Sequence, residues 1–232
     1  MRESDIPEIR RLPLFDGMSD ASFEQLTRGA YVQTFPPQVE LLHEGDSSDF
    51  LHILSEGSVE LFARWNRRET TMAIEHPLAV FILAATIRDA PYLMSARTLE
   101  KARIILLPST DVRAVFATEH AFARAVVTEL AQSYRQVVKS SKDLRLRSSI
   151  ERLANYLLRQ RAAGSGDCAI TLAMEKRRLA SILGMTAENL SRAFKSLQAY
   201  GVQVDGATVT IGDPTDLIRL AKPTPLIDDP DR

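Results

Sequence analysis

Three polar side chains between residues 186 and 197 have a spacing that would place them together on one face of a helix. Glu188, Ser191 and Arg192 stand at positions i, i+3 and i+4. Arginine can donate two hydrogen bonds to guanine O6 and N7, glutamate can accept one from cytosine N4–H, and serine can bind either kind of group. The pattern therefore predicts contacts with base edges in a DNA major groove. The alternative interpretation is an ordinary solvated helix face.

The residues around this trio predict two short helices joined by a tight turn. On the second helix Leu190, Phe194 and Leu197 fall at i, i+4 and i+7, which gives that helix an apolar inner face. Gly184 can adopt the positive φ that ends the first helix, and Thr186 is a suitable N-cap for the second. A helix-turn-helix is expected, with the trio near the N-terminal end of the helix that enters the groove.

A hairpin is predicted directly after these helices. The stretch Val202–Ile211 contains two alternating apolar runs around Asp205-Gly206, a strong signal for a two-residue turn. A helix-turn-helix followed by a β-hairpin is a winged helix.

The charge distribution supports a nucleic-acid partner for this region. The net charge is −1, yet residues 139–200 carry 12 Lys and Arg against 5 Asp and Glu. The alternative is a solvated basic face. We expect phosphate contacts from one threonine and four basic residues, namely Lys176, Arg177, Arg178, Thr186 and Lys195.

Composition excludes several other classes of protein. The single cysteine, Cys168, rules out an intramolecular disulfide and any multi-cysteine metal or iron–sulfur site. The N-terminal residues show no secretory signal, and the most apolar stretch, residues 77–85, is too short for a membrane span. We therefore expect a cytoplasmic protein with no membrane partner.

The preceding part of the chain predicts a barrel and a long helix. Short strand-like runs punctuated by turns fill residues 31–107, as in an antiparallel β-barrel or jelly roll. Residues 111–161 contain neither glycine nor proline and carry an apolar seam with alternating steps of four and three, typical of a parallel coiled-coil dimer. A helix packed on its own domain is the alternative. The seam comprises Ala123, Val127, Leu130, Tyr134 and Val137 and extends to Ser141 and Leu144.

The expected fold is thus α+β: an N-terminal antiparallel β-barrel or jelly roll at residues 1–118, a dimerisation helix at 119–141, and a winged helix-turn-helix at 142–232. A helix break is expected at Lys139–Asp143, with Ser141 or Asp143 capping the next helix. The residues from about 223 onward are expected to be disordered.

This order of elements resembles the CRP/FNR superfamily of transcription regulators over nearly the whole chain. The landmarks are Glu44-Gly45-Asp46, the run Ile53–Val59, and the segment Glu188–Arg192. In the FNR-like branch, Glu, Ser and Arg at this spacing read half-sites with a TTG core in an inverted repeat. The resemblance implies the same role for Glu188, Ser191 and Arg192, with half-site centres about 34 Å apart in a two-fold dimer.

The resemblance also bears on the effector. Family members that bind cyclic AMP hold its phosphate with a Gly-Glu pair and an Arg-Ser or Arg-Thr pair. Residues 77–97 contain no Gly-Glu pair, and Met94 precedes Ser95 where arginine would be needed. Phosphate would be costly to bury there uncompensated, so cyclic AMP is not expected. The iron–sulfur cluster of the oxygen-sensing members needs several cysteines and is excluded.

Within the superfamily, the segments 81–85 and 90–97 look most like the NnrR and DNR types, which respond to nitrogen oxides. That likeness implies an activator of nitric oxide and denitrification genes that contacts RNA polymerase, with haem as a candidate cofactor. Haem needs an axial ligand in an apolar pocket. Of the four histidines, which also include His43 and His52, the candidates are His76 and His120.

Two alternatives remain. One is a FixK-like regulator that needs no effector. The other, from a different class, is a metal-dependent barrel enzyme, for which the sequence offers only the near pairs His43-Glu44 and Glu75-His76 and no His-x-His. An enzyme is therefore not expected.

Overall fold

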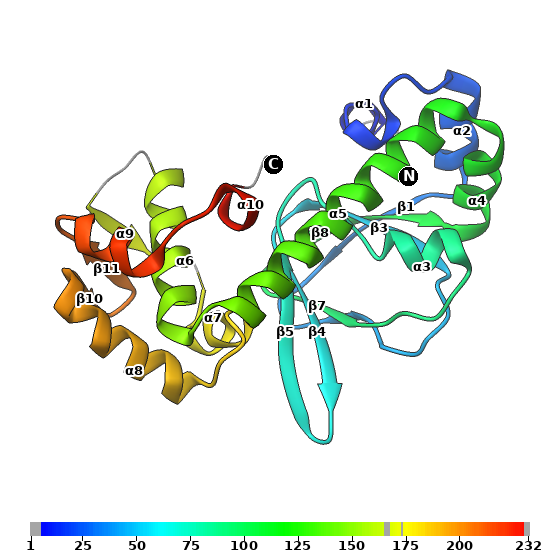
Figure 1. Cartoon of the computed structure of the whole chain (residues 1–232). Coiled ribbons are helices and arrows are strands. Elements are labelled where there is room, and N and C mark those ends of the chain that lie inside the picture. Colours follow the sequence, from blue (N-terminus) through cyan, green and yellow to red (C-terminus); the bar gives the residue numbers. More distant parts are fainter. Residues whose placement is uncertain (1–5, 165–167, 173, 230–232) are drawn as a thin grey trace. The chain divides into compact units, whose positions relative to one another are not determined.

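The computed structural model describes residues 6–164, 168–172 and 174–229 (Figure 1). The chain forms two compact units that meet in sequence between Ser133 and Tyr134. Among the described residues, the first unit contains eight strands and the second contains three.

Two antiparallel four-stranded sheets make up the strand-rich part of the first unit. Their strand orders are β1-β8-β3-β6 and β2-β7-β4-β5, which agrees with the predicted barrel-like jelly roll. The strands are β1 (Tyr31–Phe35), β2 (Glu40–Leu42), β3 (Phe50–Glu56), β4 (Val59–Trp65), β5 (Arg68–Glu75), β6 (Val80–Phe81), β7 (Ser95–Thr98) and β8 (Ala102–Pro108).

Strand β8 shows why the sheets stack as they do. Successive side chains of a strand point to opposite faces. Ala102 and Ile104 join the core between the two sheets, whereas Ile105 and Leu107 join a second core beneath helices. Both faces of this sheet are thus covered, which is why β8 reads as an almost continuous apolar run.

Helices cover the outer face of that sheet. Helix α2 begins at Asp20, because Ser19 caps it by accepting a hydrogen bond from the Ser22 N–H at 3.3 Å. The remaining short helix α3 lies between β6 and β7. The helical segments of this unit are α1 (Ile6–Arg10), the 3-10 turn Pro13–Phe15, α2 (Asp20–Arg28), α3 (Leu83–Arg88) and α4 (Ser109–Thr118).

The long helix ends later than the sequence predicted. Helix α5 runs unbroken from His120 to Leu146, so the break expected at Lys139–Asp143 is wrong. The next helix, α6 (Ser149–Ala163), is capped by Ser148, whose side chain and that of Glu151 bond each other's backbone N–H groups. This reciprocal box decides the boundary. Ser141 and Asp143 each have a leucine three residues later and cannot form one.

The second unit packs helices against a three-stranded sheet of order β10-β11-β9. One core cluster joins Leu153 and Leu157 of α6 to Leu190 of α8 and Val209 of β11. Its remaining elements are β9 (Ala169–Thr171), α7 (Lys176–Ile182), α8 (Ala187–Leu197), the 3-10 turn Gln198–Tyr200, β10 (Val202–Asp205), β11 (Thr208–Ile211), α9 (Thr215–Ala221) and α10 (Pro225–Asp228).

The predicted wing hairpin is present, with its turn shifted by one residue. Asp205 pairs with Thr208, so the turn residues are Gly206 and Ala207 rather than Asp205-Gly206. This register places Val204 opposite Val209 and Val202 opposite Ile211. Both turns would leave these four side chains on the same face of the hairpin, so the apolar pattern alone does not distinguish the two registers.

The expectation of disorder from about residue 223 is wrong for the residues described. Residues Pro225–Asp228 form α10, and Asp228 pairs with Arg147 and Arg159. Composition alone could not reveal partners that lie so far away in sequence. Residues 230–232 lie outside the described part of the chain.

Candidate nucleic-acid interface

Helices α7 and α8 form the predicted helix-turn-helix. The inner face of α8 is fully packed: Leu190, Phe194 and Leu197 have exposed fractions of 7% or less. Thr186 caps α8 as predicted, and its hydroxyl accepts a hydrogen bond from the Asn189 N–H at 3.1 Å. This packing fixes the rotation of α8 about its axis, so its opposite face always points to solvent.

The turn between these helices requires glycine. Gly184 has a φ of 61°, in the left-handed region. A Cβ at this position would also overlap the end of the Leu144 side chain on α5, which would have to move aside. The positive φ is therefore the main reason for glycine in this turn.

The predicted base-reading residues come together on the exposed face of α8. The side chains of Glu188 and Arg192 are 84% and 70% exposed. The Arg192 guanidinium donates to the Asn189 side-chain oxygen at 2.8 Å and lies 3.9 Å from the Glu188 carboxylate. Ser191 is also exposed, and its hydroxyl donates to the Ala187 carbonyl. These weak surface contacts orient the side chains and leave them accessible.

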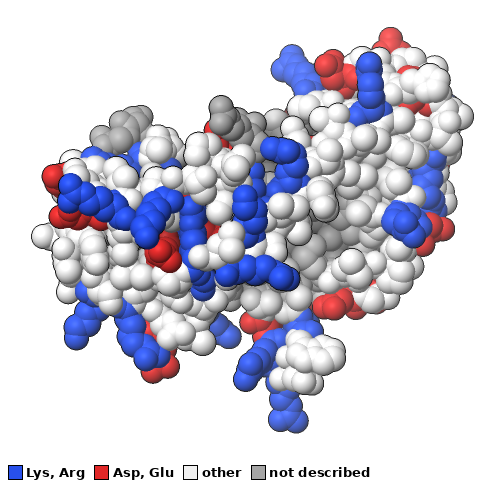
Figure 2. Space-filling model, in the orientation of Figure 1, with Lys and Arg blue, Asp and Glu red and all other residues white. Residues whose placement is uncertain are grey.

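The predicted phosphate contacts differ in their availability. Lys176, Arg177 and Lys195 are exposed, and the Lys176 ammonium lies 6.0 Å from the centre of the Phe194 ring. Arg178 is only 19% exposed and forms an ion pair with Glu175 at 3.3 Å. Figure 2 shows Lys and Arg side chains spread across the visible face of the second unit.

Two residues of this interface were not anticipated from the sequence. Asn189 is hydrogen-bonded to both Thr186 and Arg192. It precedes Arg192 by three residues on the same helix, and this spacing could have indicated that it orients the arginine. Arg152 is 7% exposed and donates from Nε to the Leu183 carbonyl at 2.7 Å. The sequence does not indicate the burial of Arg152, because an arginine within a predicted helix is usually exposed at the surface.

The predicted coiled-coil seam lies on α5 as an apolar stripe. Val127, Tyr134 and Val137 are 58%, 71% and 65% exposed, whereas Ala123 and Leu130 are half-buried. Leu144, at the end of the seam, is 47% exposed.

The histidines have contrasting environments. The predicted haem ligands His76 and His120 are both exposed, so the described residues around them do not fit a haem group that needs an apolar pocket. His52 is 5% exposed, and its Nδ1 has no hydrogen-bond partner among the described residues. Burial lowers the pKa of His52 to about 4, despite an opposing hydrogen bond with the Phe50 backbone.

The arginine that lies closest to Ser95 in the sequence is already paired with carboxylates. Ser95 is buried, and its hydroxyl already accepts a hydrogen bond from the Glu44 N–H at 3.0 Å. The nearby Arg97 is bound to Glu60 at 2.7 Å and to Glu69 at 2.6 Å. Its charge is therefore neutralised within the sheet.

No described helix is both long and apolar enough to cross a bilayer. In the described ranges, no three His, Cys, Asp or Glu side chains are grouped so as to hold a metal ion.

Comparisons with known proteins match this architecture. The family model of the Crp-like helix-turn-helix domain matches residues 151–220, and that of the cyclic nucleotide-binding domain matches residues 32–119. No curated protein matches the chain significantly.

Solved structures share the fold at low sequence identity. FixK2 from Bradyrhizobium japonicum is 19% identical with a TM-score of 0.70, covering 84% of this chain and 98% of that one. A transcriptional regulator of the CRP/FNR family from Eubacterium rectale is 17% identical with a TM-score of 0.72, covering 91% and 98%. DNR from Pseudomonas aeruginosa is 18% identical with a TM-score of 0.51, covering 95% and 100%.

The two family models match adjacent parts of one chain in the order barrel, then helix-turn-helix, and the structure joins them through a long helix. The family's members are regulators and not enzymes. With a cyclic nucleotide-binding domain followed by a Crp-like helix-turn-helix domain, the chain belongs to the CRP/FNR family of DNA-binding transcription regulators.

Proposed function

We propose that this protein acts as a homodimer on an inverted repeat with TTG-type half-sites, with α8 of each copy in a major groove. The observation that carries the proposal is the face formed by Glu188, Ser191 and Arg192, which is exposed while the other side of α8 is buried. Arg192 pairs bidentately with guanine, and Glu188 accepts from cytosine of the same half-site.

Phosphate contacts fix the register of α8 in the groove. Lys176, Arg177 and Lys195 supply them, together with Thr186 at the N-terminus of α8, where the backbone N–H groups favour anions. Arg178 contributes after exchanging Glu175 for a phosphate oxygen.

Dimerisation is supported by the stripe on α5. Val127, Tyr134 and Val137 expose apolar surface at the spacing of a coiled-coil seam, and a second copy of α5 would cover it. Two-fold symmetry then places two copies of α8 about one helical turn apart on the duplex.

Cyclic AMP is not the effector in this proposal. The Ser95 hydroxyl accepts from the Glu44 N–H, and the Arg97 guanidinium is held by Glu60 and Glu69. The Ser95 O–H remains able to donate to a phosphate oxygen, but an entering phosphate would have to draw Arg97 away from Glu60 and Glu69, and Met94 offers no charge in its place.

The resemblance to the nitrogen-oxide-responsive regulators supports an activator of nitric oxide and denitrification genes that contacts RNA polymerase. The effector-independent alternative is favoured by one observation, namely that His76 and His120 are exposed. An absorbance spectrum of the purified protein with added haem and nitric oxide separates the two. A Soret band that shifts with the gas supports a sensor, and no band supports regulation by abundance.

The test of DNA reading uses fluorescence anisotropy with a duplex carrying an inverted TTG repeat. Arg192→Ala is expected to weaken specific binding by about 1–3 kcal/mol and to relax selectivity at one base pair. An unchanged base preference would contradict the assignment.

The matched control removes a charge that does not read bases. Arg177→Ala is expected to weaken binding to all sequences alike and to reduce the salt slope by about 1. If both variants behave identically on cognate and scrambled duplexes, α8 does not read sequence through Arg192.

A further inference from the structure

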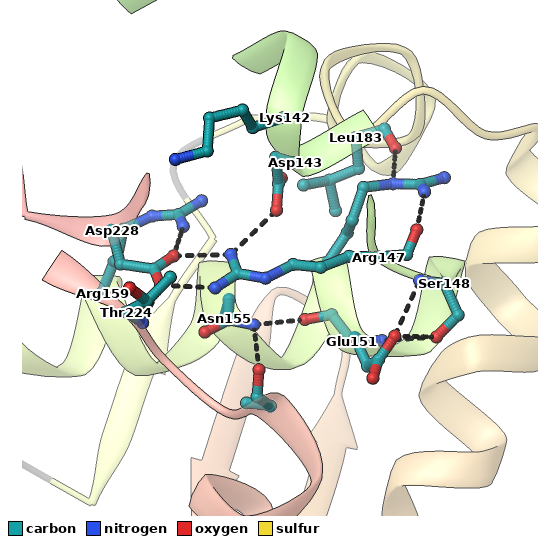
Figure 3. A network of polar contacts seen from close by, with 12 residues as sticks. Lys142, Asp143, Arg147, Ser148, Glu151, Asn155, Arg159, Leu183, Thr224 and Asp228 are labelled. Carbon is teal, nitrogen blue, oxygen red and sulfur yellow. Dashed lines mark hydrogen bonds and ion pairs between the residues drawn. The ribbon is translucent and has the colours of Figure 1, made fainter. Parts of the chain in front are cut away.

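The segment after α9 crosses back over the junction between α5 and α6 (Figure 3). Helix α10 contributes no buried residue, so it adds little to the hydrophobic core of the second unit. Its contacts are polar and are directed at the end of α5. Such a segment restrains its neighbours rather than filling space between them.

Asp228 is the centre of these contacts. Both terminal nitrogens of Arg147 donate to its carboxylate, at 2.8 and 2.6 Å, and Arg159 donates at 2.7 Å. The Thr224 N–H adds a fourth bond at 2.8 Å. The side chains of Arg147 and Asp228 are only 8% and 10% exposed. Bidentate, shielded pairs of this kind are among the stronger polar contacts in proteins.

The contacts around Asp228 favour its ionised carboxylate. Partial burial acts to raise the pKa of Asp228, but the hydrogen bonds from Arg147 and Thr224 outweigh it and lower that pKa. The bond to Asp228 in turn raises the pKa of Arg147. The pair stays ionised at neutral pH.

Two lysines of α5 hold the same segment at other points. The Lys139 ammonium donates to the Asp229 carbonyl at 2.6 Å, and Lys139 is 8% exposed. Lys142 donates to the Leu226 carbonyl at 3.5 Å. Contacts with this segment thus follow the last two turns of α5 and the residue after it, from residue 139 to 147.

Arg147 also links this segment to the turn of the helix-turn-helix. It is the residue that follows α5, and its carbonyl accepts a bond from Arg152 at 2.6 Å. The same Arg152 guanidinium donates to the carbonyls of Leu183 and Gly184, at 2.7 and 3.3 Å. A continuous set of hydrogen bonds therefore joins α10, the α5–α6 junction and the turn before α8.

We propose that residues 224–229 act as a clasp that fixes the angle between the end of α5 and α6, and so sets the orientation of α8 on the dimerisation helix. For its effect on DNA, the clasp rests on the function proposed above. When these contacts break, the non-helical residues 147 and 148 between α5 and α6 are no longer restrained. The orientation of α8 relative to the dimerisation helix then varies more widely.

The first test measures the clasp without DNA. In Asp228→Asn the charge that holds Arg147 is lost, and amide hydrogen exchange at residues 147–152 is expected to quicken by about tenfold or more. Asp228→Glu, which keeps a carboxylate, is expected to restore much of the protection. Asp216→Asn is the matched control, because its ion pair with Arg219 is exposed, and it should leave exchange unchanged.

A second variant covers the case in which Asp228→Asn does not fold, as judged by circular dichroism. Lys139→Met removes the tether to the Asp229 carbonyl and leaves no buried charge, and it should also quicken exchange at the junction. Wild-type protection in every folded variant would overturn the clasp.

The second test measures its consequence. Asp228→Asn is expected to lose about fivefold or more in affinity for the inverted repeat and to bind an isolated half-site as wild type does, since only the repeat requires two heads in register. If affinity falls equally for the inverted repeat and the half-site, or does not fall for the repeat, the contacts of residues 224–229 do not set the orientation of α8. If the wild-type protein binds neither duplex, the proposed function fails, while hydrogen exchange still decides whether the clasp exists.

Discussion

At the scale of single residues, the fold decides which charges remain available. Arg97 and Arg192 are the same residue type in similarly polar surroundings in the sequence. Arg97 is 17% exposed and held by Glu60 and Glu69, whereas Arg192 is 70% exposed. Only the second can exchange its partners for a base edge without leaving a buried carboxylate unpaired. Exposure, rather than residue type, therefore supports Arg192 as the proposed base-reading residue.

His52 gives a prediction at this scale. Its pKa is about 4 in the folded protein and 6.5 when unperturbed, so below pH 6.5 the unfolded chain binds a proton that the folded protein excludes. His52 therefore destabilises the fold increasingly as the pH falls from 6.5 to 4, by up to about 3 kcal/mol. Urea unfolding of wild type and His52→Leu across this range should show a shallower pH dependence in the variant.

The exposed His76 is the control for that experiment, because His76→Gln should follow the wild-type curve. A His52→Leu curve parallel to wild type would show that the imidazole is not held neutral.

At the scale of elements, turns and caps place the boundaries. The β4–β5 hairpin turns at Asn66 and Arg67, with φ angles of 47° and 65°. Two successive positive φ values are typical of a type I′ turn, in which glycine is favoured at the second position. Arginine is strained there because its Cβ crowds the backbone.

Arg67→Gly is accordingly expected to stabilise the protein by about 0.5–1 kcal/mol, measured as a rise in the urea midpoint or melting temperature. The neighbouring Arg68→Gly is the matched control. Arg68 pairs with Trp65 in the strand ladder, so glycine there should destabilise by a similar amount. A lower melting temperature for Arg67→Gly would contradict the turn geometry.

At the scale of the whole molecule, the exposed apolar stripe on α5 supports the proposed homodimer. The exposed fractions of Val127, Tyr134 and Val137 all exceed one half, and they repeat along one side of a helix of 27 residues. Removing such a stripe from contact with water is favourable in proportion to the apolar area that is covered.

Tyr134→Arg is expected to convert a dimer into a monomer in sedimentation equilibrium and to abolish tight binding to the inverted repeat, because it places like charges face to face in the seam. Gln136→Arg, on the outer side of the same helix, should remain dimeric. A dimeric Tyr134→Arg would place the interface elsewhere.

Much of this could be predicted from the sequence, because it depends on local patterns. The i, i+4, i+7 spacing of Leu190, Phe194 and Leu197 determined α8, and Gly184 and Thr186 determined the turn and cap before it. The barrel, the long helix and the family resemblance followed from the same kind of information.

What only the tertiary structure decided depends on partners distant in sequence. The helix boundary moved from 139–143 to 147–148 because of the box formed by Ser148 and Glu151, and the wing hairpin pairs Val204 with Val209 rather than with Ala207. The order of residues 224–229 and the burial of His52 could not be read from neighbours, since Arg147 lies 81 residues from Asp228. Periodicity reports which face of an element is apolar, whereas pairing between charges requires the chain to be folded.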